Sequence, residues 1–317
     1  MIGIFVFLAS VLTLVFIYAT LATILNFEAG WGGLWDLGTA GLLAVGAYCY
    51  VILTVESNEI IFSPQLPVWA GIIVTSIFTG AVAFLIGLPS LRMRDEYFLI
   101  TTFAFSVVVL QLITTESSIT LGATGFHNIQ RPFDDYVSTR SYNFVLLGIS
   151  TFVLITIWLL IRRLGRSPFG RLLRAIRDNE PAAKSIGKMV FVTRLKVFVI
   201  TGALIGAISP MYVWYIRSLS PHMFHVTLAF TVWTALVIGG IGNFWGPVVG
   251  ALILIGLTEA LQFLQYSAEY AVLLSAARPI IIGVGLIIVM RFRPEGILPE
   301  KHSFKNARKI IDYQKQI

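Results

Sequence analysis

The sequence predicts an all-α, polytopic transmembrane helical bundle, and three observations support this fold class. Hydrophobic residues make up 57% of the 317 residues, whereas charged residues make up only 12%. Apolar stretches of about 20 residues, the length of helix that crosses a bilayer, recur along the whole chain. Glycine-rich interruptions separate some of these stretches and indicate broken membrane segments. A soluble domain of this composition would aggregate, so we expect a membrane protein of about eight to ten spans.

The apolar stretches predict nine spans in order along the chain. These are residues 2–25, 37–55, 66–89, 97–115, 142–161, 192–216, 226–241, 247–265 and 272–290. No positive residue precedes the first span and no small-residue cleavage site follows it, so we expect it to remain as a membrane helix. We expect one transmembrane domain over residues 1–317, with a cytoplasmic tail at residues 292–317.

Nineteen of the 23 lysine and arginine residues gather in three segments, and the other four are Arg131, Arg140, Arg217 and Arg278. The three segments are Arg92 with Arg94, ten residues within 162–196, and seven within 291–315. The positive-inside rule places these segments in the cytoplasm and the loops 116–141 and 217–225 outside. The C-terminus is then cytoplasmic and, with nine spans, the N-terminus is outside. The net charge of +7 therefore indicates topology and contact with membrane lipid rather than nucleic acid.

The cytoplasmic loop 162–196 carries signals for two short helices. Ser167 followed by Pro168 is a typical helix start, because serine caps the first turn and proline needs no hydrogen-bond partner there. Apolar side chains then recur on one face, which predicts an amphipathic helix lying along the membrane interface. That face is Leu172, Leu173 and Ile176, with Arg171, Arg174 and Arg177 turned largely away.

A helix break is predicted at Asp178 and Asn179, since Pro181 disfavours helical geometry in the residue before it. A second helix, at about 180–186, should then end at Gly187, which suits a left-handed C-cap. Such a helix, held between two basic arms, is suited to dock into a groove of another protein. The alternative is a solvated basic loop that only sets topology.

The stretch "AIRDNEPAAKSIG" resembles the coupling loop of ATP-binding cassette (ABC) importer permeases, in which an E-A-A…G pattern forms the helix that inserts into the ATPase subunit. The resemblance implies an ATPase-coupling helix made of Arg177, Asp178, Asn179, Glu180, Pro181, Ala182, Ala183 and Gly187. The small alanines would allow close approach of the partner, and the glycine would let the chain turn back towards the membrane.

The resemblance to branched-chain amino acid permeases of the LivM type covers nearly the whole chain. The matching blocks are "LRMRDEYFLITTFAF", "GATGFHNI", "SPFGRLLRAIRDNEPAAKSIG", "VIGGIGNFWGPVVGALIL" and "MRFRPEGIL", in that order. The resemblance implies an importer of branched-chain or other apolar amino acids in a bacterial or archaeal cytoplasmic membrane. The implied partners are a LivH-type permease, two ATP-binding cassette subunits and an extracytoplasmic substrate-binding protein.

The chain itself contains no G-x-x-x-x-G-K-[ST] P-loop, so we expect ATP to be bound by partner subunits. We also expect no catalytic residue, no bound cofactor and no metal site. Two alternatives remain open. One is an importer of urea or short-chain amides with the same architecture, and the other is an ion-coupled secondary transporter or channel.

Two stretches, "AGWGGLWDLGTAG" and "VIGGIGNFWGPVVG", each combine glycines with tryptophan at an interruption between apolar runs. Interrupted segments at corresponding places in two halves point to a transport pathway, because unwound backbone is tolerated at membrane depth only where protein or water covers it. Tight interfacial turns are the alternative. The candidate pathway residues are Asn26, Gly30, Gly32, Gly33, Asp36, Thr39, Gly239, Gly240, Gly242, Asn243 and Glu259.

Two of these candidates, Asp36 and Glu259, are acidic residues close to or within apolar segments. A carboxylate in the hydrocarbon core is costly, so Asp36 must face protein, water or the interface. It could line a polar cavity or tie down a broken helix end. Glu259 could contact the neighbouring permease or belong to the pathway. The related permeases usually have asparagine and histidine where this chain has Asp36 and Thr39, which bears on the substrate more than on the fold.

Overall fold

The structure is a computed structural model that describes residues 2–55, 63–93, 95–134, 137, 141–263 and 290–300, with single positions at 280, 283, 284 and 287. Eight apolar helices lie in the described residues, and each overlaps one predicted span. They are α1 (Ile2–Asn26), α2 (Thr39–Thr54), α3 (Val68–Ser90), α4 (Asp95–Thr115), α6 (Tyr142–Arg166), α9 (Val190–Ile216), α10 (Val226–Gly239) and α11 (Gly246–Phe263). The ninth predicted span, 272–290, and the tail beyond residue 300 lie outside the described residues, apart from the single positions. The prediction of a polytopic helical bundle is confirmed.

Six of the described helices are long and apolar enough to cross a membrane, whereas α2 and the apolar part of α11 are shorter. The remaining elements are short connections. They are the π-helix η1 (Phe27–Gly32), α5 (Ser117–Thr120), α7 (Pro168–Asp178), α8 (Glu180–Ser185), the 3-10 helix η2 (Pro221–Phe224), and the strands β1 (Phe126–His127) and β2 (Ser218–Leu219). The two strands pair antiparallel.

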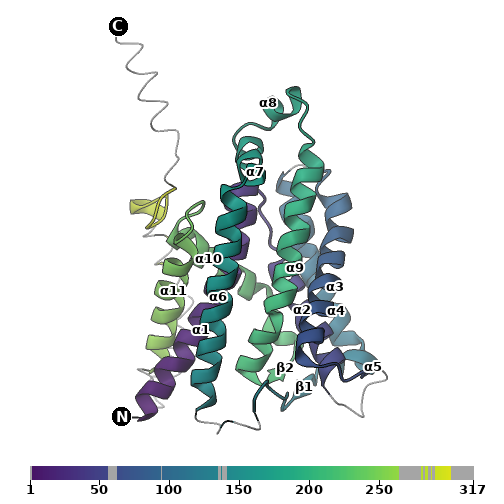
Figure 1. Cartoon of the computed structure of the whole chain (residues 1–317), viewed down its shortest axis with the longest axis vertical. Helices are drawn as coiled ribbons and strands as arrows, with labels where there is room; N and C mark the ends of the chain where they lie inside the picture. Colours follow the sequence, from purple (N-terminus) through teal and green to yellow (C-terminus); the bar gives the residue numbers. More distant parts are fainter. Residues whose placement is uncertain are drawn as a thin grey trace.

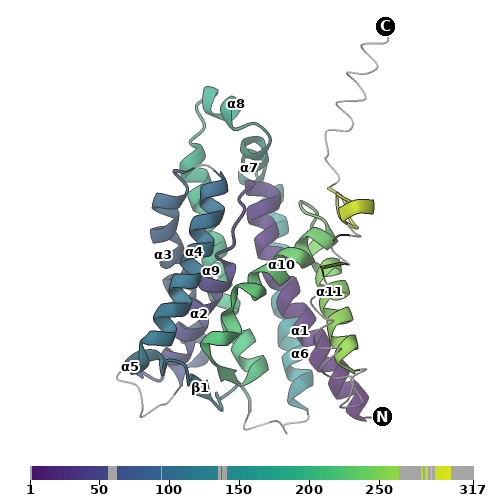
Figure 2. The ribbon, with the colours of Figure 1, turned by 180° about the vertical axis from the view of Figure 1, so that it is seen from behind.

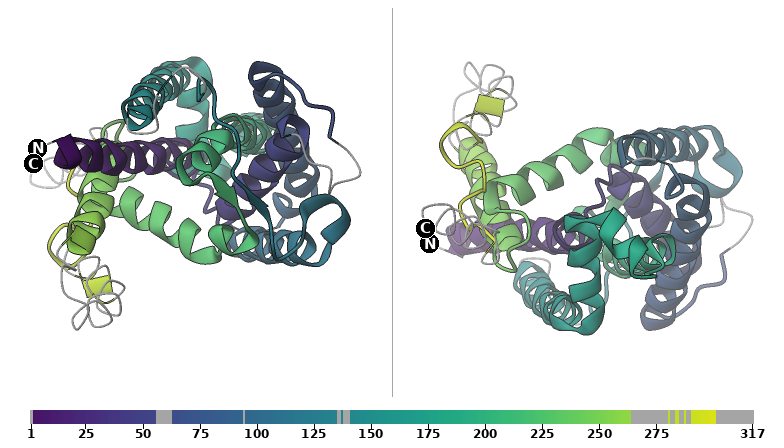
Figure 3. Two further views of the ribbon diagram at one scale, coloured as in Figure 1. Left: turned by 90° about the horizontal axis from the view of Figure 1, so that it is seen from below. Right: turned by 90° about the horizontal axis from the view of Figure 1, so that it is seen from above.

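Two helices organise the bundle. Helix α9 packs against α2 and α3, and α1 packs against α6, α10 and α11 (Figure 1). From the opposite side, α10 crosses obliquely in front of α1 (Figure 2). Viewed along the bundle, α1 runs between α6 on one side and the α10–α11 pair on the other (Figure 3). Because α1 also contacts α9, the two groups form one bundle.

Small residues allow the closest helix approaches, as is usual in membranes. Gly206 of α9 lies so close to α3 that an added Cβ would stand 2.7 Å from Cβ of Thr79. Gly46 of α2 likewise faces Ser209 of α9, where an added Cβ would stand 2.6 Å from Oγ. The α10–α11 elbow is closer still, because a Cβ on Gly250 would overlap the carbonyl oxygen of Ala235.

The bundle has two distinct ends. The α8 end carries α7, α8 and residues 290–300, and the α5 end carries α5, the β1–β2 pair and the start of α1 (Figures 1 and 2). Residues 297 and 298 are bound to the α8 end by backbone hydrogen bonds to Ile238 and Gly239, of 2.9 and 3.0 Å. The described part of the tail is therefore on the same end as the loop 162–196, and the first helix begins at the other end.

The first membrane helix does not end where the glycine-rich interruption begins. Helical structure continues past Asn26 as η1, and the chain becomes extended only after Gly33, whose φ is +67°. The predicted break after the first span therefore lies about two turns later than the sequence pattern indicates. The reason is that Asn26 and Gly30 are needed within helical geometry for contacts described below.

We predict that Gly250→Ala destabilises the protein, because the new Cβ would overlap the backbone carbonyl of Ala235 and push α10 and α11 apart. Overpacking of this kind costs about 1–3 kcal/mol of unfolding free energy. Gly256→Ala is the matched control in the same helix, since a Cβ there meets nothing within 4 Å. Thermal unfolding of the two purified variants in detergent checks this, and equal melting temperatures would contradict it.

Candidate functional site

The two glycine-broken segments meet at the α8 end through the side chain of Asn26. Its Nδ2 donates to the carbonyl of Asn243 at 2.8 Å, and its Oδ1 accepts from the backbone N–H of Gly242 at 2.8 Å. The Asn26 side chain is buried. We call Asn26, Gly30, Gly242 and Asn243 the Asn26 junction. It satisfies backbone groups of an unwound segment that would otherwise be buried without partners.

Two positions of the Asn26 junction require glycine. A Cβ on Gly30 would lie 2.6 Å from Oδ1 of Asn26 and 2.7 Å from the nitrogen of Gly242. Gly242 itself has a φ of +82°, where other residues are strained. The sequence nominated all four residues, and the structure brings them together.

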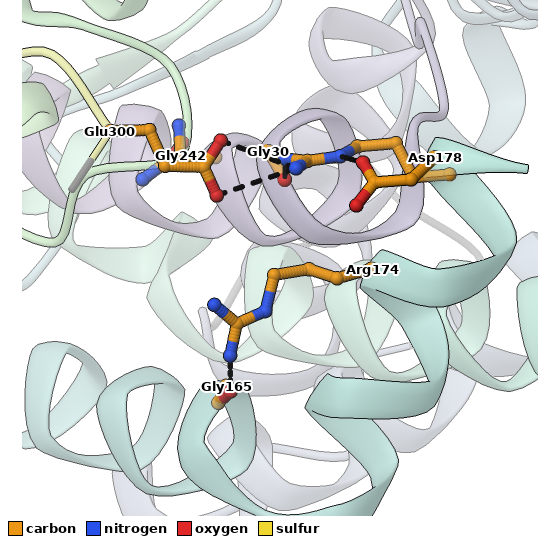
Figure 4. A network of polar contacts seen from close by, with 8 residues as sticks. Gly30, Gly165, Arg174, Asp178, Gly242 and Glu300 are labelled. Atoms are coloured by element: carbon orange, nitrogen blue, oxygen red, sulfur yellow. Dashed lines mark hydrogen bonds and ion pairs between the residues drawn. The ribbon is translucent and has the colours of Figure 1, made fainter. Parts of the chain in front are cut away.

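Arg177 of α7 joins the Asn26 junction to the loop 162–196. Its Nη1 donates to the carbonyl of Gly30, and its Nη2 lies 3.2 Å from Oε2 of Glu300. Its Nε also pairs with Asp178 at 3.0 Å (Figure 4). The guanidinium thus links α7, η1 and the segment 290–300.

Of the three arginines expected to turn away from the apolar face, Arg171 is exposed, whereas Arg174 and Arg177 are half-buried and make polar contacts inside the molecule. Arg174 turns back to donate to the carbonyl of Gly165 at 3.3 Å (Figure 4). The physical reason is that the ends of α6 and η1 leave carbonyls without helical partners, and the long guanidinium fork reaches them. The predicted apolar face is correct, since Leu173 and Ile176 are buried.

The predicted boundaries of the two helices in the loop are confirmed. The Ser167 side chain accepts from the N–H of Gly170 at the start of α7, and the Asn179 side chain accepts from Ala182 at the start of α8, at 3.0 Å. Gly187 has a φ of +76° after α8. The chain reverses there, which makes α7 and α8 a hairpin-like projection at the end of the molecule (Figure 1).

The α7–α8 projection exposes large apolar side chains at its tip. Ile186 and Met189 are each 71% exposed. Beside them lies a cavity of about 510 Å³, lined in part by Phe169, Leu172 and Ile186. Exposed apolar surface of this kind, among charged residues, is typical of a site that contacts another protein.

The two alanines of the coupling motif do not share one role. Ala183 is buried and packs with Ile176 and Val190, whereas Ala182 is exposed. The expectation that both alanines leave space for a partner is therefore wrong for Ala183. Its small size instead allows α8 to pack onto α7 and α9.

Glu180 fixes α8 to the membrane helix that follows. It pairs with Lys184 at 2.6 Å and with Arg194 of α9 at 3.1 Å. The hydrogen bond from Lys184 and the charge of Arg194 outweigh partial burial and lower the pKa of Glu180 below its usual 4.5. The motif acid is thus an anchor of the projection. Exposed Pro181 follows it in the first turn of α8, where proline is tolerated.

Asp36 and Thr39 are buried in a separate corner, where the extended segment enters α2. Oδ1 of Asp36 accepts from the N–H of Gly38 at 2.7 Å, and Oδ2 accepts from the hydroxyl of Thr39 at 3.3 Å. The carbonyl of Asp36 accepts from Nε1 of Trp233 in α10 at 2.6 Å. Each of these contacts lies within the chain's own packing and holds the end of the break in place.

The remaining nominated residues are dispersed. Gly32 is buried in η1, and Gly33 supports Arg177, since an added Cβ would stand 2.9 Å from its Cγ. Gly239 and Gly240 form the α10–α11 elbow. Half-buried Glu259 lies in the last turns of α11, and this helix ends at the α5 end of the bundle (Figure 1).

Sequence reasoning missed Glu28, which is fully buried in η1. Its carboxylate accepts from the hydroxyl of Thr201 in α9, and its Oε2 has no hydrogen-bond partner among the described residues. The same argument that selected Asp36, an acid inside an apolar run, could have selected Glu28. Thr201 and Trp233 gave no comparable signal, because neither is unusual in a membrane helix.

Comparison with known proteins places this architecture in one family. The model of the branched-chain amino acid transport system permease component matches residues 7–285. The chain is 27% identical over 309 residues to the high-affinity branched-chain amino acid transport system permease protein LivM of Escherichia coli (strain K12), covering 90% of this chain and 69% of that one. No solved structure matches the chain.

Two archaeal relatives extend the comparison. The probable branched-chain amino acid transport permease protein LivM of Methanocaldococcus jannaschii is 29% identical over 320 residues, covering 90% of this chain and 91% of that one. The probable permease protein LivH of the same organism is 24% identical over 237 residues, covering 74% and 73%. The similarity to both permease types extends over most of the chain.

We predict that Asn26→Ala destabilises the bundle by about 2–4 kcal/mol, because the buried Gly242 N–H and the half-buried Asn243 carbonyl would lose their hydrogen-bond partners. Thr23→Ala is the control, since the Thr23 hydroxyl donates to the carbonyl of Ala19 in its own helix, at 2.6 Å. Thermal unfolding of both variants in detergent measures the difference. A fall in melting temperature no larger than that of the control would refute the role of the Asn26 carboxamide.

The Glu180 ion pairs predict that the local stability of α8 depends on pH. Because folding lowers the pKa, the stabilisation is complete above pH 4.5 and is lost as pH falls through the folded value. Glu180→Gln should therefore increase hydrogen exchange in α8 at neutral pH, and the difference from the unaltered chain should disappear once the pH has fallen below the lowered pKa of Glu180. Glu96→Gln, which changes an exposed acid, should have no such effect. A Glu180→Gln difference that persists at low pH would contradict this.

Proposed function

The chain belongs to the branched-chain amino acid transport system permease family, and from this premise we propose that it forms one half of the translocation pathway of an ATP-driven importer. The proposed substrates are branched-chain or other apolar amino acids. The observation that carries the proposal is the family match over residues 7–285, together with a coupling-type projection joined to the broken membrane segments. None of the described contacts favours the urea importer or the ion-coupled carrier.

The proposed orientation places the α8 end in the cytoplasm. The positive residues of loop 162–196 gather there, as the positive-inside rule requires. The start of α1 is then extracytoplasmic and the tail after residue 290 is cytoplasmic. The proposed location is a bacterial or archaeal cytoplasmic membrane.

The proposed partners follow from the same architecture. A LivH-type permease would complete the pathway, and two ATP-binding cassette subunits would bind and hydrolyse ATP. An extracytoplasmic binding protein would deliver substrate at the α5 end. The exposed apolar tip of α8, centred on Ile186 and Met189, is the proposed contact with an ATPase subunit.

The contacts of Arg177 suggest how movement of α8 reaches the membrane. A displacement of α8 would carry α7 with it, because the buried Ala183 and Ile176 pack the two helices together. Arg177 would then pull on the carbonyl of Gly30 and on Glu300. The Asn26 junction joins Gly30 to the α10–α11 elbow, so α1 and α10 would shift together. Opening and closing of the pathway would follow from this shift.

The remaining candidate residues have different proposed roles. Gly239 and Gly240 would act as the flexible elbow, and Asp36 with Thr39 would hold the end of the break fixed against α10. Glu259 is proposed to contact the partner permease. Selectivity would be determined largely by the binding protein.

The decisive experiment is purification and reconstitution of the tagged chain with its neighbouring subunits. The ATPase and second-permease chains should co-purify, and proteoliposomes should take up leucine only with ATP and with an intact P-loop lysine in the ATPase. Uptake by this chain alone, without ATP, would exclude the ABC importer.

A narrower prediction concerns the tip of α8. Ile186→Glu should reduce ATPase co-purification about tenfold or more, because a charge replaces an apolar contact at the centre of a protein interface. Phe133→Glu makes the same kind of change at the α5 end, where Phe133 is 61% exposed, and should leave the ATPase bound. Equal retention of the ATPase by the two variants would rule out this docking site.

A further inference from the structure

A cavity of about 280 Å³ lies beside the Asn26 junction, on the side of α6. Its wall combines arginine with aromatic side chains. The residues that carry the argument are Trp158, Arg162, Arg166, Arg174, Phe244 and Trp245. We call this cavity the α6 pocket.

The α6 pocket is strongly basic. Arg162, Arg166 and Arg174 line it, and none of them forms an ion pair with a carboxylate in the described part of the chain. Glu300, the acid on its wall, is paired with Arg177 at 3.2 Å. The pocket therefore holds three positive charges that lack a protein counter-ion among the described residues.

Aromatic rings hold two of the arginines in position. The guanidinium of Arg162 lies 4.9 Å from the ring centre of Trp158, and that of Arg166 lies 5.8 Å from that of Phe244. Trp158 is itself fixed, since its Nε1 donates to the carbonyl of Phe244 at 2.8 Å. Such contacts orient guanidinium groups without neutralising them.

Two donors at the α6 pocket are buried without hydrogen-bond partners among the described residues. They are Nε of Arg174 and Nε1 of Trp31, and the Trp31 side chain is only 2% exposed. Buried donors are almost always satisfied in native proteins. Both donor atoms lie behind the surface of the pocket, so the polar groups available to an occupant are the guanidinium groups that line it.

The surroundings of the α6 pocket match a lipid headgroup region. The outer face of α6 is apolar and exposed up to the pocket, with Phe152 70% and Leu159 52% exposed. Trp158 packs on Trp245, 55% exposed, at a ring-centre distance of 4.6 Å. Tryptophan at the boundary of an apolar surface marks the membrane interface.

We propose that the α6 pocket binds the phosphate of an anionic phospholipid in the leaflet at the α8 end, with its acyl chains along α6. Guanidinium groups match phosphate oxygens in geometry and charge, and basic pockets between membrane helices bind anionic headgroups. The exposed apolar face of α6 leads to the pocket, so a lipid whose acyl chains lie on that face brings its headgroup to the three arginines. Since Arg174 and Arg177 are on the same helix, the bound lipid contacts α7, which also holds the Asn26 junction.

The test measures binding of fluorescent phosphatidylglycerol to the purified full-length chain in detergent. The variant is Arg162→Gln with Arg166→Gln, and the control is Arg163→Gln with Arg291→Gln, which removes the same charge from exposed arginines outside the pocket. The pocket variant should bind at least about tenfold more weakly, and the control should bind like the unaltered chain. Equal affinity of the two variants overturns the proposal.

Two further measurements separate a lipid from other ligands. Millimolar inorganic phosphate should not displace the probe, and fluorescent phosphatidylcholine should bind equally to both variants. Displacement by phosphate would show a site for a soluble anion and overturn the proposal. If the double variant does not fold, Arg166→Gln replaces it, because Arg166 is exposed. A weakening of about threefold is then expected, and no weakening overturns the proposal.

Discussion

The carboxamide of Asn26 binds backbone from two distant parts of the chain, and the arrangement of the α8 end depends on this contact. Unwound backbone inside a membrane protein must find hydrogen-bond partners within the protein, because the bilayer offers none. Asn26 supplies an acceptor to Gly242 and a donor to Asn243 at once. The close approach it requires explains why Gly30 has no side chain, and Gly242 is glycine because its φ is +82°. The α10–α11 elbow, η1 and the segment 290–300 are all assembled around this point.

Arginine extends this constraint to the surface. Arg177 satisfies the carbonyl of Gly30 while pairing with Glu300, so the loop between α6 and α9 is connected to the broken segment by a charged hydrogen bond. A lysine could not make these contacts in one fixed plane. The projection is otherwise held by local capping and by the Glu180 ion pairs, and its apolar tip is exposed. The base of the α7–α8 projection is therefore fixed by polar contacts, whereas the apolar side chains at its tip are exposed.

The two buried acids near the break differ in their surroundings. Asp36 accepts hydrogen bonds from Gly38 and Thr39 and functions as a local tie. Glu28 has Thr201 as a partner for one oxygen, and its other oxygen has none among the described residues. The contrast matters because an incompletely satisfied acid is the more expensive one to retain in a membrane. Of these two acids, Glu28 is therefore the one whose burial is less fully compensated by the contacts of the fold.

The sequence by itself determined the class, the positions of the eight described apolar helices and the boundaries of α7 and α8. These depend on apolar run length and on capping by Ser167, Asn179 and Gly187, which act over three or four residues. Only the tertiary structure decided that Asn26 meets Gly242, that Arg177 turns inward and that Ala183 is buried. Those contacts join residues separated by up to 217 positions, and no local pattern encodes which distant carbonyl a side chain will reach. The sequence indicated which polar and charged residues are energetically unfavourable in a membrane. The three-dimensional packing determined which hydrogen bonds and ion pairs compensate each of them.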